Sequence, residues 1–239
     1  MWVWPFCRIV SLFAVAPLLY HRSIPIQVKV ALSLAIAALV APSLPASNIP
    51  LNSMAAIELL AQQMLLGLAI GFSMRLVFAA VELAGDLIGL QMGLSFASFI
   101  NPQSNTQSPL IGSLLGVLAS LLFLSMNGHL MMISAITESF RTFPIAPLSN
   151  DTSLPLNSAK LVAWTGELFR LGLHLSLPVL ATMLILNLGL GVLVRSAPQL
   201  NLFAIGFPVT LLVGLLVLTL SLPYFAPYLQ TALEQATRF

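Results

Sequence analysis

Few side chains in this sequence could do chemistry. Only 7% of its residues are charged, against roughly 25% in an ordinary soluble domain. His21, His129 and His174 lie far apart, without carboxylates or cysteines at the spacing of a metal site. Cys7 is the single cysteine, which excludes an internal disulfide. The sequence has no glycine-rich phosphate loop either. It therefore predicts no catalytic residue, no metal and no cofactor, and a protein that is not an enzyme.

Three charged residues nevertheless share one face of a long apolar segment. Arg75, Glu82 and Asp86 are spaced seven and four residues apart, which places them on the same side of a helix. A charged side chain at the centre of a bilayer costs about 2.5 to 3.5 kcal/mol. These residues therefore predict ion pairs at an interface with another subunit or a water-filled interior. The alternative is a kinked helix whose wet middle carries all three charges.

A polar loop interrupts the longest uncharged part of the chain. No formal charge occurs between Asp86 and Glu138, yet the middle of this stretch is rich in Asn, Gln, Ser and Pro. Backbone without helical hydrogen bonds is not tolerated against lipid, so it must be buried in protein or line a cavity. The loop begins with apolar and aromatic residues, Phe96, Phe99 and Ile100, followed by Asn101 and Pro102. We expect an aromatic loop that bounds a pore; ordinary helix packing of Phe96 and Phe99 is the alternative.

Helices must position these residues, because 59% of the chain is hydrophobic and apolar runs alternate with Pro- and Asn-rich breaks. The pattern predicts an all-α, membrane-type fold. The expected helices span residues 2–20, 27–40, 54–99, 110–140, 161–194 and 202–222, followed by a short tail. The third would be about 69 Å long, twice the thickness of the hydrocarbon core. It must therefore bend, break or lie largely outside the bilayer.

Small residues recur at intervals of four on the third predicted helix. Gly85, Gly89 and Gly93 form a ladder, and Gly67/Gly71 and Gly112/Gly116 repeat the spacing. Such faces let helix backbones approach closely in membrane proteins. We therefore expect Gly85, Gly89 and Gly93 to be helix-packing positions.

Four motifs in register along the chain resemble the FliR/SctT family of type III secretion export-gate proteins. They lie at residues 85–102, 123–130, 139–144 and 195–208. The first reads GDLIGLQMGLSFASFINP, and its LQMGLSF run favours the flagellar FliR branch over the injectisome branch. Four motifs in the same order make this resemblance far more specific than any one of them.

The resemblance implies a subunit of the flagellar protein export gate. Such a subunit assembles with FliP and FliQ, with FlhB alongside, as a hetero-oligomer that contains one copy of it. Unfolded flagellar proteins pass through the assembly. The expected location is the bacterial inner membrane, in contact with lipid at the flagellar basal body, with the core raised toward the periplasm. The sparse charges give no nucleic-acid footprint.

The resemblance also implies a division of the chain and a role for the loop. Residues 1–157 would be FliP-like, and residues 158–239 would form a FliQ-like helical hairpin that turns at 195–201. The loop at 95–109 would be the channel plug, with Phe96, Phe99 and Ile100 as the sealing side chains. Two other functions are weighed against this one. A secondary transporter would need broken helices in matched halves, whereas the halves here differ in length, and a simple membrane anchor would need no polar loop.

Overall fold

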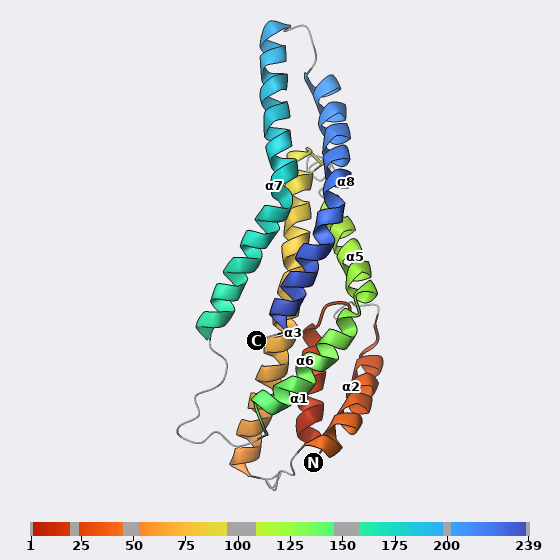
Figure 1. Ribbon diagram of the computed structural model, residues 1–239, viewed down its shortest axis with the longest axis vertical. Helices are drawn as coiled ribbons and strands as arrows, with labels where there is room; N and C mark the ends of the chain where they lie inside the picture. The colour runs from red at the N-terminus through yellow and green to blue at the C-terminus, as the bar shows by residue number, and fades with distance from the viewer. Residues whose placement is uncertain are drawn as a thin grey trace, which may run out of the picture. The chain divides into compact units, whose positions relative to one another are not determined.

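The computed structural model describes residues 2–19, 24–44, 53–94, 109–145, 158–197 and 202–237. Within these ranges the regular structure is helical, without a β-strand, and this confirms the all-α fold (Figure 1). The elements are α1 (Val3–Val15), α2 (Ile26–Val40), the 3₁₀ helix η1 (Ala41–Ser43), α3 (Met54–Gln91), α5 (Leu110–Ser125), α6 (Gly128–Thr142), α7 (Ser158–Ser196) and α8 (Leu202–Ala236).

Four segments among the described residues are long and apolar enough to cross a membrane. They are α2 with η1, α3, α7 and α8. In addition, α5 and α6 form a broken pair, bent by 69° at a break of no more than four residues. The apolar windows differ in burial, because 56% of the α3 window is buried but only 11% of the α7 window and 17% of the α8 window. Most of the surface of α7 and α8 is therefore available for lipid or another protein.

The first and third predicted helices end earlier than expected. Helix α1 stops at Val15 instead of residue 20, and Ala16 is already extended, with ψ of 140°, as expected for a residue that precedes a proline. Helix α3 stops at Gln91 instead of residue 99. Gly93 therefore lies outside the helix on which it was predicted to pack.

The fourth and last predicted helices also differ from expectation. The segment predicted as one helix at 110–140 is two helices, because Asn127 adopts a left-handed conformation with φ of 56°. Conversely, α8 does not end near residue 222 but continues to Ala236 through Pro223 and Pro227. Proline is tolerated inside membrane helices when neighbouring groups satisfy the freed carbonyls, so it is a weaker helix terminator here than in soluble proteins.

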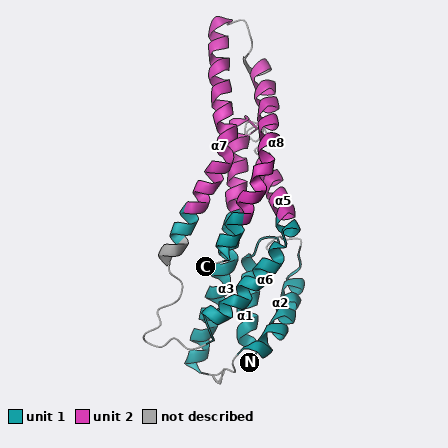
Figure 2. Ribbon diagram, in the orientation of Figure 1, with its two compact units in different colours: residues 1–77, 123–166, 231–239 teal, residues 78–122, 167–230 magenta. Residues whose placement is uncertain are grey.

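Unit 1 comprises residues 1–77, 123–166 and 231–239 (Figure 2). In it, α1 packs against α2 and against the first part of α3. A side chain at Gly71 of α3 would lie 2.7 Å from the carbonyl oxygen of Leu12, so the backbones of α3 and α1 are in close contact. Trp4 packs with Ala56 and Leu59 in a buried cluster.

Unit 2 comprises residues 78–122 and 167–230 (Figure 2). Its core lies along the second part of α3, where Val81, Ala84 and Ile88 are almost completely buried. Helix α7 approaches α3 closely, because a side chain at Gly172 would lie 2.7 Å from the carbonyl oxygen of Ala80. Helix α3 thus supplies residues to both units.

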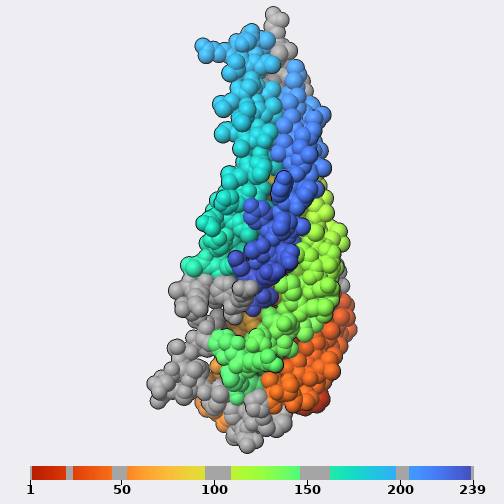
Figure 3. All heavy atoms as spheres, in the orientation of Figure 1, coloured from red at the N-terminus to blue at the C-terminus, as the bar shows by residue number. Residues whose placement is uncertain are grey.

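On the face shown in Figure 3, atoms of α7 and α8 lie at the surface along these helices. Large apolar side chains of α7 and α8 are exposed, among them Ile185, Leu188, Leu212 and Leu220. Each compact unit draws on both sides of residue 157. The division into a FliP-like part, 1–157, and a FliQ-like part, 158–239, concerns family relationships and remains a prediction.

Candidate functional site

The predicted plug lies between the end of α3 and the start of α5. Five predicted plug residues fall outside the described residues: Phe96, Phe99, Ile100, Asn101 and Pro102. The two flanking ends are described, and both belong to unit 2. They are the turn that follows Gln91 and the first turn of α5 at Leu110.

The end of α3 is closed by a glycine cap. Gly93 has a positive φ of 80°. The N–H of Leu94 donates to the carbonyl of Gly89 at 3.0 Å, and the N–H of Gly93 donates to that of Leu90 at 3.1 Å. These two bonds, with a left-handed glycine after the helix, define a Schellman motif. Gly93 therefore terminates α3 firmly just before the predicted plug.

A wide groove borders this cap within unit 2. Its volume is about 660 Å³. Its wall includes polar side chains from α3 and α7, Gln91 and Asn187, and from α8, Thr210. A side chain at Gly191, also in this wall, would meet no atom within 4 Å. The groove therefore has room for additional side chains beside the point where the predicted plug loop begins.

Helices α3 and α5 cross at a pair of glycines. A Cβ atom added to Gly85 would lie 2.6 Å from the Cα atom of Gly112 and 2.8 Å from its nitrogen. Real Cβ atoms do not approach so closely, so only glycine at residue 85 permits this backbone contact. The helix-packing role of Gly85 stays a prediction, and the close backbone contact supports it.

The other two members of the predicted ladder differ from Gly85. A Cβ atom at Gly89 would lie 3.5 Å from Cγ1 of Ile111, an ordinary van der Waals distance. Gly93 does not lie on the helix at all. Equal spacing in the sequence thus conceals three structural situations, namely a backbone contact, a loose side-chain contact and a helix cap.

The predicted interface carboxylates lie over the same crossing. A side chain at Gly116 would lie 3.1 Å from Oε1 of Glu82, and one at Gly112 would collide with Oδ1 of Asp86. Glycines on α5 therefore leave room for both carboxylates of α3. Glu82 is exposed and Asp86 is half-buried, so each keeps a side that another molecule can reach.

Arg75, the third predicted charge, is half-buried on the part of α3 that belongs to unit 1. Elsewhere in the described residues, α6 and α7 each carry an ion pair between charges three residues apart. Arg170 pairs with Glu167 at 2.7 Å and Arg141 with Glu138 at 3.4 Å. All four side chains are about half exposed or more, so both are surface pairs within one helix.

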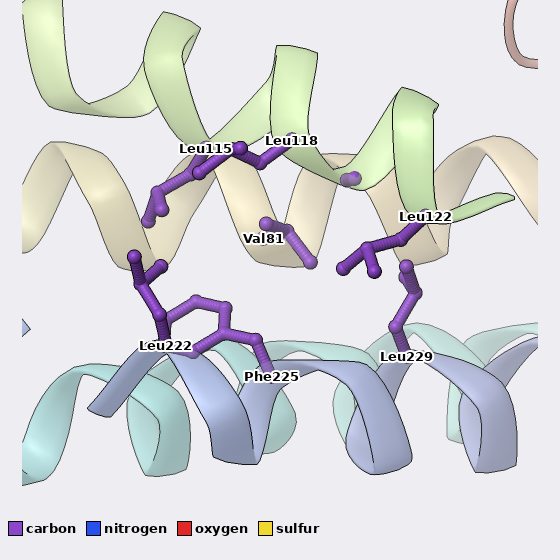
Figure 4. A pocket seen from close by; sticks show the side chains of 8 residues that line it. Val81, Leu115, Leu118, Leu122, Leu222, Phe225 and Leu229 are labelled. Atoms are coloured by element: carbon purple, nitrogen blue, oxygen red, sulfur yellow. The ribbon is translucent and has the colours of Figure 1, made fainter. Parts of the chain in front are cut away.

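An apolar cavity lies beside the crossing. It has a volume of about 190 Å³ and is lined by α3, α5 and α8. Figure 4 shows Val81 of α3 and Leu115 of α5 directed toward the same space as Leu222 and Phe225 of α8. The lining side chains are all hydrocarbon, so none of them could orient a ligand by a hydrogen bond.

The most elaborate polar site in the described residues is one that the sequence analysis missed. Arg8 of α1 is completely buried, with 0% of its surface exposed. Its guanidinium donates four hydrogen bonds. Nε donates to Oε1 of Gln63 at 2.7 Å, NH1 to O and Oγ of Ser139 at 2.9 and 3.1 Å, and NH2 to O of Phe143 at 2.9 Å. All of these groups belong to unit 1.

The electrostatics of this site are unusual because its acceptors are neutral. Burial lowers the pKa of Arg8 to about 9, so the side chain remains a cation at neutral pH. Its Cζ atom lies 4.1 Å from the ring centroid of Phe140, in a cation–π contact. Nearby on α3, Oε1 of Gln62 and Nε2 of Gln63 are buried without a hydrogen-bond partner in the described part of the chain.

The sequence contains only a weak signal for this site. An arginine inside an apolar helix is costly unless it is paired or hydrogen-bonded, and Arg8 stands alone in that position within α1. Its acceptors, however, are 55, 131 and 135 residues away. Local spacing therefore could not have assembled the site.

The described ranges contain no group of three or more His, Cys, Asp or Glu side chains that could hold a metal ion. His129 and His174 are both exposed.

Comparison with known proteins gives a consistent result over the whole chain. The family described as bacterial export proteins, family 1, matches residues 1–236. The chain is 45% identical over 230 residues to the flagellar biosynthetic protein FliR of Escherichia coli (strain K12), covering 95% of this chain and 86% of that protein. It is 45% identical over 227 residues to FliR of Pectobacterium carotovorum subsp. carotovorum, covering 94% and 85%. It is 32% identical over 220 residues to FliR of Bacillus subtilis (strain 168), covering 89% and 82%. These relatives are named as biosynthetic proteins and the family as export proteins, neither as enzymes.

Proposed function

The chain belongs to the bacterial export proteins of family 1, and we propose that it is a FliR subunit of a flagellar protein export gate. The observation that carries the proposal is the likeness to flagellar FliR proteins along nearly the whole chain, in both compact units. The chain is a component of the flagellar export apparatus and an integral membrane protein, as its long apolar helices indicate. We place it in the inner membrane at the flagellar basal body, with the assembled core toward the periplasm.

The proposed partners are FliP and FliQ, which form the core complex with one copy of this subunit, and FlhB alongside. The apolar windows of α7 and α8 are at most 17% buried within the chain, which supports extensive contact with other helices or with lipid. In this proposal, residues 1–157 take the place of a FliP subunit, and residues 158–239 take the place of a FliQ hairpin.

The proposed plug consists of Phe96, Phe99 and Ile100, with Asn101 and Pro102 completing the loop. A gate for unfolded polypeptide must block ions when idle and still accept any sequence. Apolar side chains suit that task, because hydrophobic constrictions close by dewetting. The Schellman cap at Gly93 supports the proposal, since it ends α3 at a fixed point before the loop.

Glu82 and Asp86 are proposed to face a partner subunit, with Arg75 on the same helix. Both carboxylates lie over glycines of α5 but keep an accessible side. If either forms an ion pair across a subunit interface, replacement by leucine leaves the partner's charge unpaired at a cost of about 3–5 kcal/mol. The yield of the complex and motility should then fall together. Glu167→Leu, at an exposed site on α7, is the matched control, and normal assembly of both Glu82→Leu and Asp86→Leu would exclude the interface role.

The assignment itself is tested by complementation and copurification. A FliR-deletion strain should regain motility when it expresses this chain, and a tagged chain should be recovered with FliP and FliQ. A transporter or a simple anchor would be recovered alone and would not restore motility. Failure of both assays would refute the proposed function.

The plug is tested separately, with Phe96, Phe99 and Ile100 all replaced by alanine. The complex should still form, because the Gly85–Gly112 crossing is untouched. The membrane should leak ions or small solutes, and growth should slow. Alanine at Leu212, Leu216 and Leu220, three exposed positions on α8, removes a similar apolar volume elsewhere and should cause no leak. An assembled but impermeable plug variant would contradict the plug and leave the family role intact.

A further inference from the structure

The break between α5 and α6 does not fix the direction of α6 by itself. Asn127 is a single left-handed residue. Its N–H donates to the carbonyl of Leu124, and its own carbonyl accepts from the N–H groups of Leu130 and Met131, where α6 begins. These bonds reach no further than the adjacent turns. Sharp bends of this kind are therefore held by contacts elsewhere in the fold.

The opposite end of α6 is held by Arg8. The last carbonyls of a helix lack partners within the helix and carry a partial negative charge that attracts cations. Arg8 donates to the carbonyl of Phe143, just after the last turn, and to that of Ser139 in the last turn, which also accepts the N–H of Phe143 at 2.9 Å. The guanidinium is thus a buried C-terminal cap, delivered by α1 to α6.

The neutral surroundings make this cap depend on geometry. Among the described residues, the acceptors of Arg8 are a side-chain amide, a hydroxyl and two backbone carbonyls, with no carboxylate. A carboxylate would attract the cation from a distance, whereas carbonyls stabilise it only at hydrogen-bonding distance and in the right direction. The guanidinium of Arg8 therefore keeps all of its hydrogen bonds only when α6 has the direction seen in the structure.

We propose that Arg8 is a positioning residue: by capping the C-terminus of α6, it fixes the direction in which α6 leaves the break at Asn127. Gln63 of α3 orients the guanidinium through Nε, so α1, α3 and α6 meet at one side chain. This role goes beyond export-gate membership and does not depend on the plug.

The test is a pair of distances within unit 1, measured by spin labels on the full chain in its complex. Cys7 is replaced by alanine, and labels are placed on exposed residues: Ile57 of α3 with Thr142 at the end of α6, and Ile57 with His129 at its start. Arg8→Lys keeps the charge, but its single ammonium cannot reach all of the acceptors. We expect the Ile57–Thr142 distance to shift and broaden, while Ile57–His129 changes little.

Two further variants keep the result interpretable. Gln63→Leu leaves Arg8 and the cap acceptors in place and should change the Ile57–Thr142 distance in the same direction, but less. Arg141→Lys, in the last turn of α6 but exposed, should change neither distance. An unchanged Ile57–Thr142 distance in assembled Arg8→Lys and Gln63→Leu would overturn the proposal. Equal broadening of both distances would also overturn it, because that is the effect of general loosening.

Discussion

Unit 1 and unit 2 hold their helices together by different chemistry. In unit 1, a buried arginine gathers α1, α3 and α6 through four hydrogen bonds. In unit 2, α3 and α5 meet at Gly85 and Gly112 without space for a single methyl group, beside a cavity lined only by hydrocarbon. The first arrangement is vulnerable to the loss of a polar group, and the second to the gain of an atom. Substitutions of opposite kinds should therefore damage the two units.

The largest effect is expected from Arg8→Met. Methionine approximates the apolar stem but leaves the amide of Gln63 and the carbonyls of Ser139 and Phe143 without their donor. Each buried acceptor that is left unsatisfied costs about 1–3 kcal/mol, and several are affected together. Thermal unfolding of the full chain in detergent should show a midpoint many degrees lower.

The result would be compared with that for Arg8→Lys, which should recover part of the loss because one or two hydrogen bonds can re-form. If Arg8→Met unfolds like the wild type, the cation does not hold unit 1 together and the contrast between the units fails.

The sequence predicted the positions of the helices better than it predicted the side-chain contacts between them. Apolar runs separated by proline and asparagine located the α-helices in the described ranges, with α5 and α6 predicted as one, since length and hydropathy alone decide whether a segment can be a membrane-type helix. Arg8 could not be assigned, because its acceptors come from two distant segments, α3 and the end of α6. A buried polar network is a property of the tertiary fold.

The next effect tests the crossing in unit 2 through Gly85→Ala and Gly89→Ala. The added methyl group at residue 85 would lie 2.6 Å from the Cα atom of Gly112. Backbone must move to make room, at a cost of about 1–3 kcal/mol. At residue 89 the methyl group would make an ordinary contact with Ile111. There, alanine should be neutral or stabilising by up to about 1 kcal/mol, because it disfavours the unfolded chain.

Thermal unfolding of the two variants, together with the yield of the complex, measures whether the change in stability has opposite signs at residues 85 and 89. Equal destabilisation by both would mean that the four-residue ladder acts as a uniform face, as its sequence suggests. That outcome would remove the special role of Gly85.

Two helix ends were missed by the sequence prediction, one at the glycine ladder of α3 and one at the break between α5 and α6. Glycines at intervals of four satisfy a packing pattern, but the same residue type also terminates helices, and only φ separates the two roles. Gly93 has φ of 80° and belongs to the second. The Asn127-Gly128 pair is also a recognised turn signal, but the apolar runs on both sides of it led to the prediction of one continuous helix. At both sites, the local backbone conformation ends the helix although the apolar periodicity continues.

A smaller effect is expected at the α3 cap. Gly93→Ala forces an L side chain into the left-handed region, which costs roughly 1–2 kcal/mol, whereas Gly93→Asn should cost less because asparagine tolerates that conformation. Hydrogen exchange of the amides of Gly93 and Leu94 should be faster in the alanine variant and close to wild type in the asparagine variant. Equal exchange in both variants would show that the positive φ does not control the end of α3.

The smallest effect is expected at a second arginine, Arg170. Comparing it with Arg8 tests whether burial is the cause of the large effect at Arg8. Arg170 in unit 2 donates to Glu167 at 2.7 Å, as short as the bond from Arg8 to Gln63, but its side chain is 67% exposed. Water already solvates both exposed charges, so an ion pair of this kind contributes only about 0.2–1 kcal/mol and is screened by salt. Arg170→Met should therefore shift the unfolding midpoint by little, and less at high salt, whereas the loss caused by Arg8→Met should persist at any salt concentration. If Arg170→Met were as damaging as Arg8→Met, the number of charges rather than their burial would set the stability of each unit.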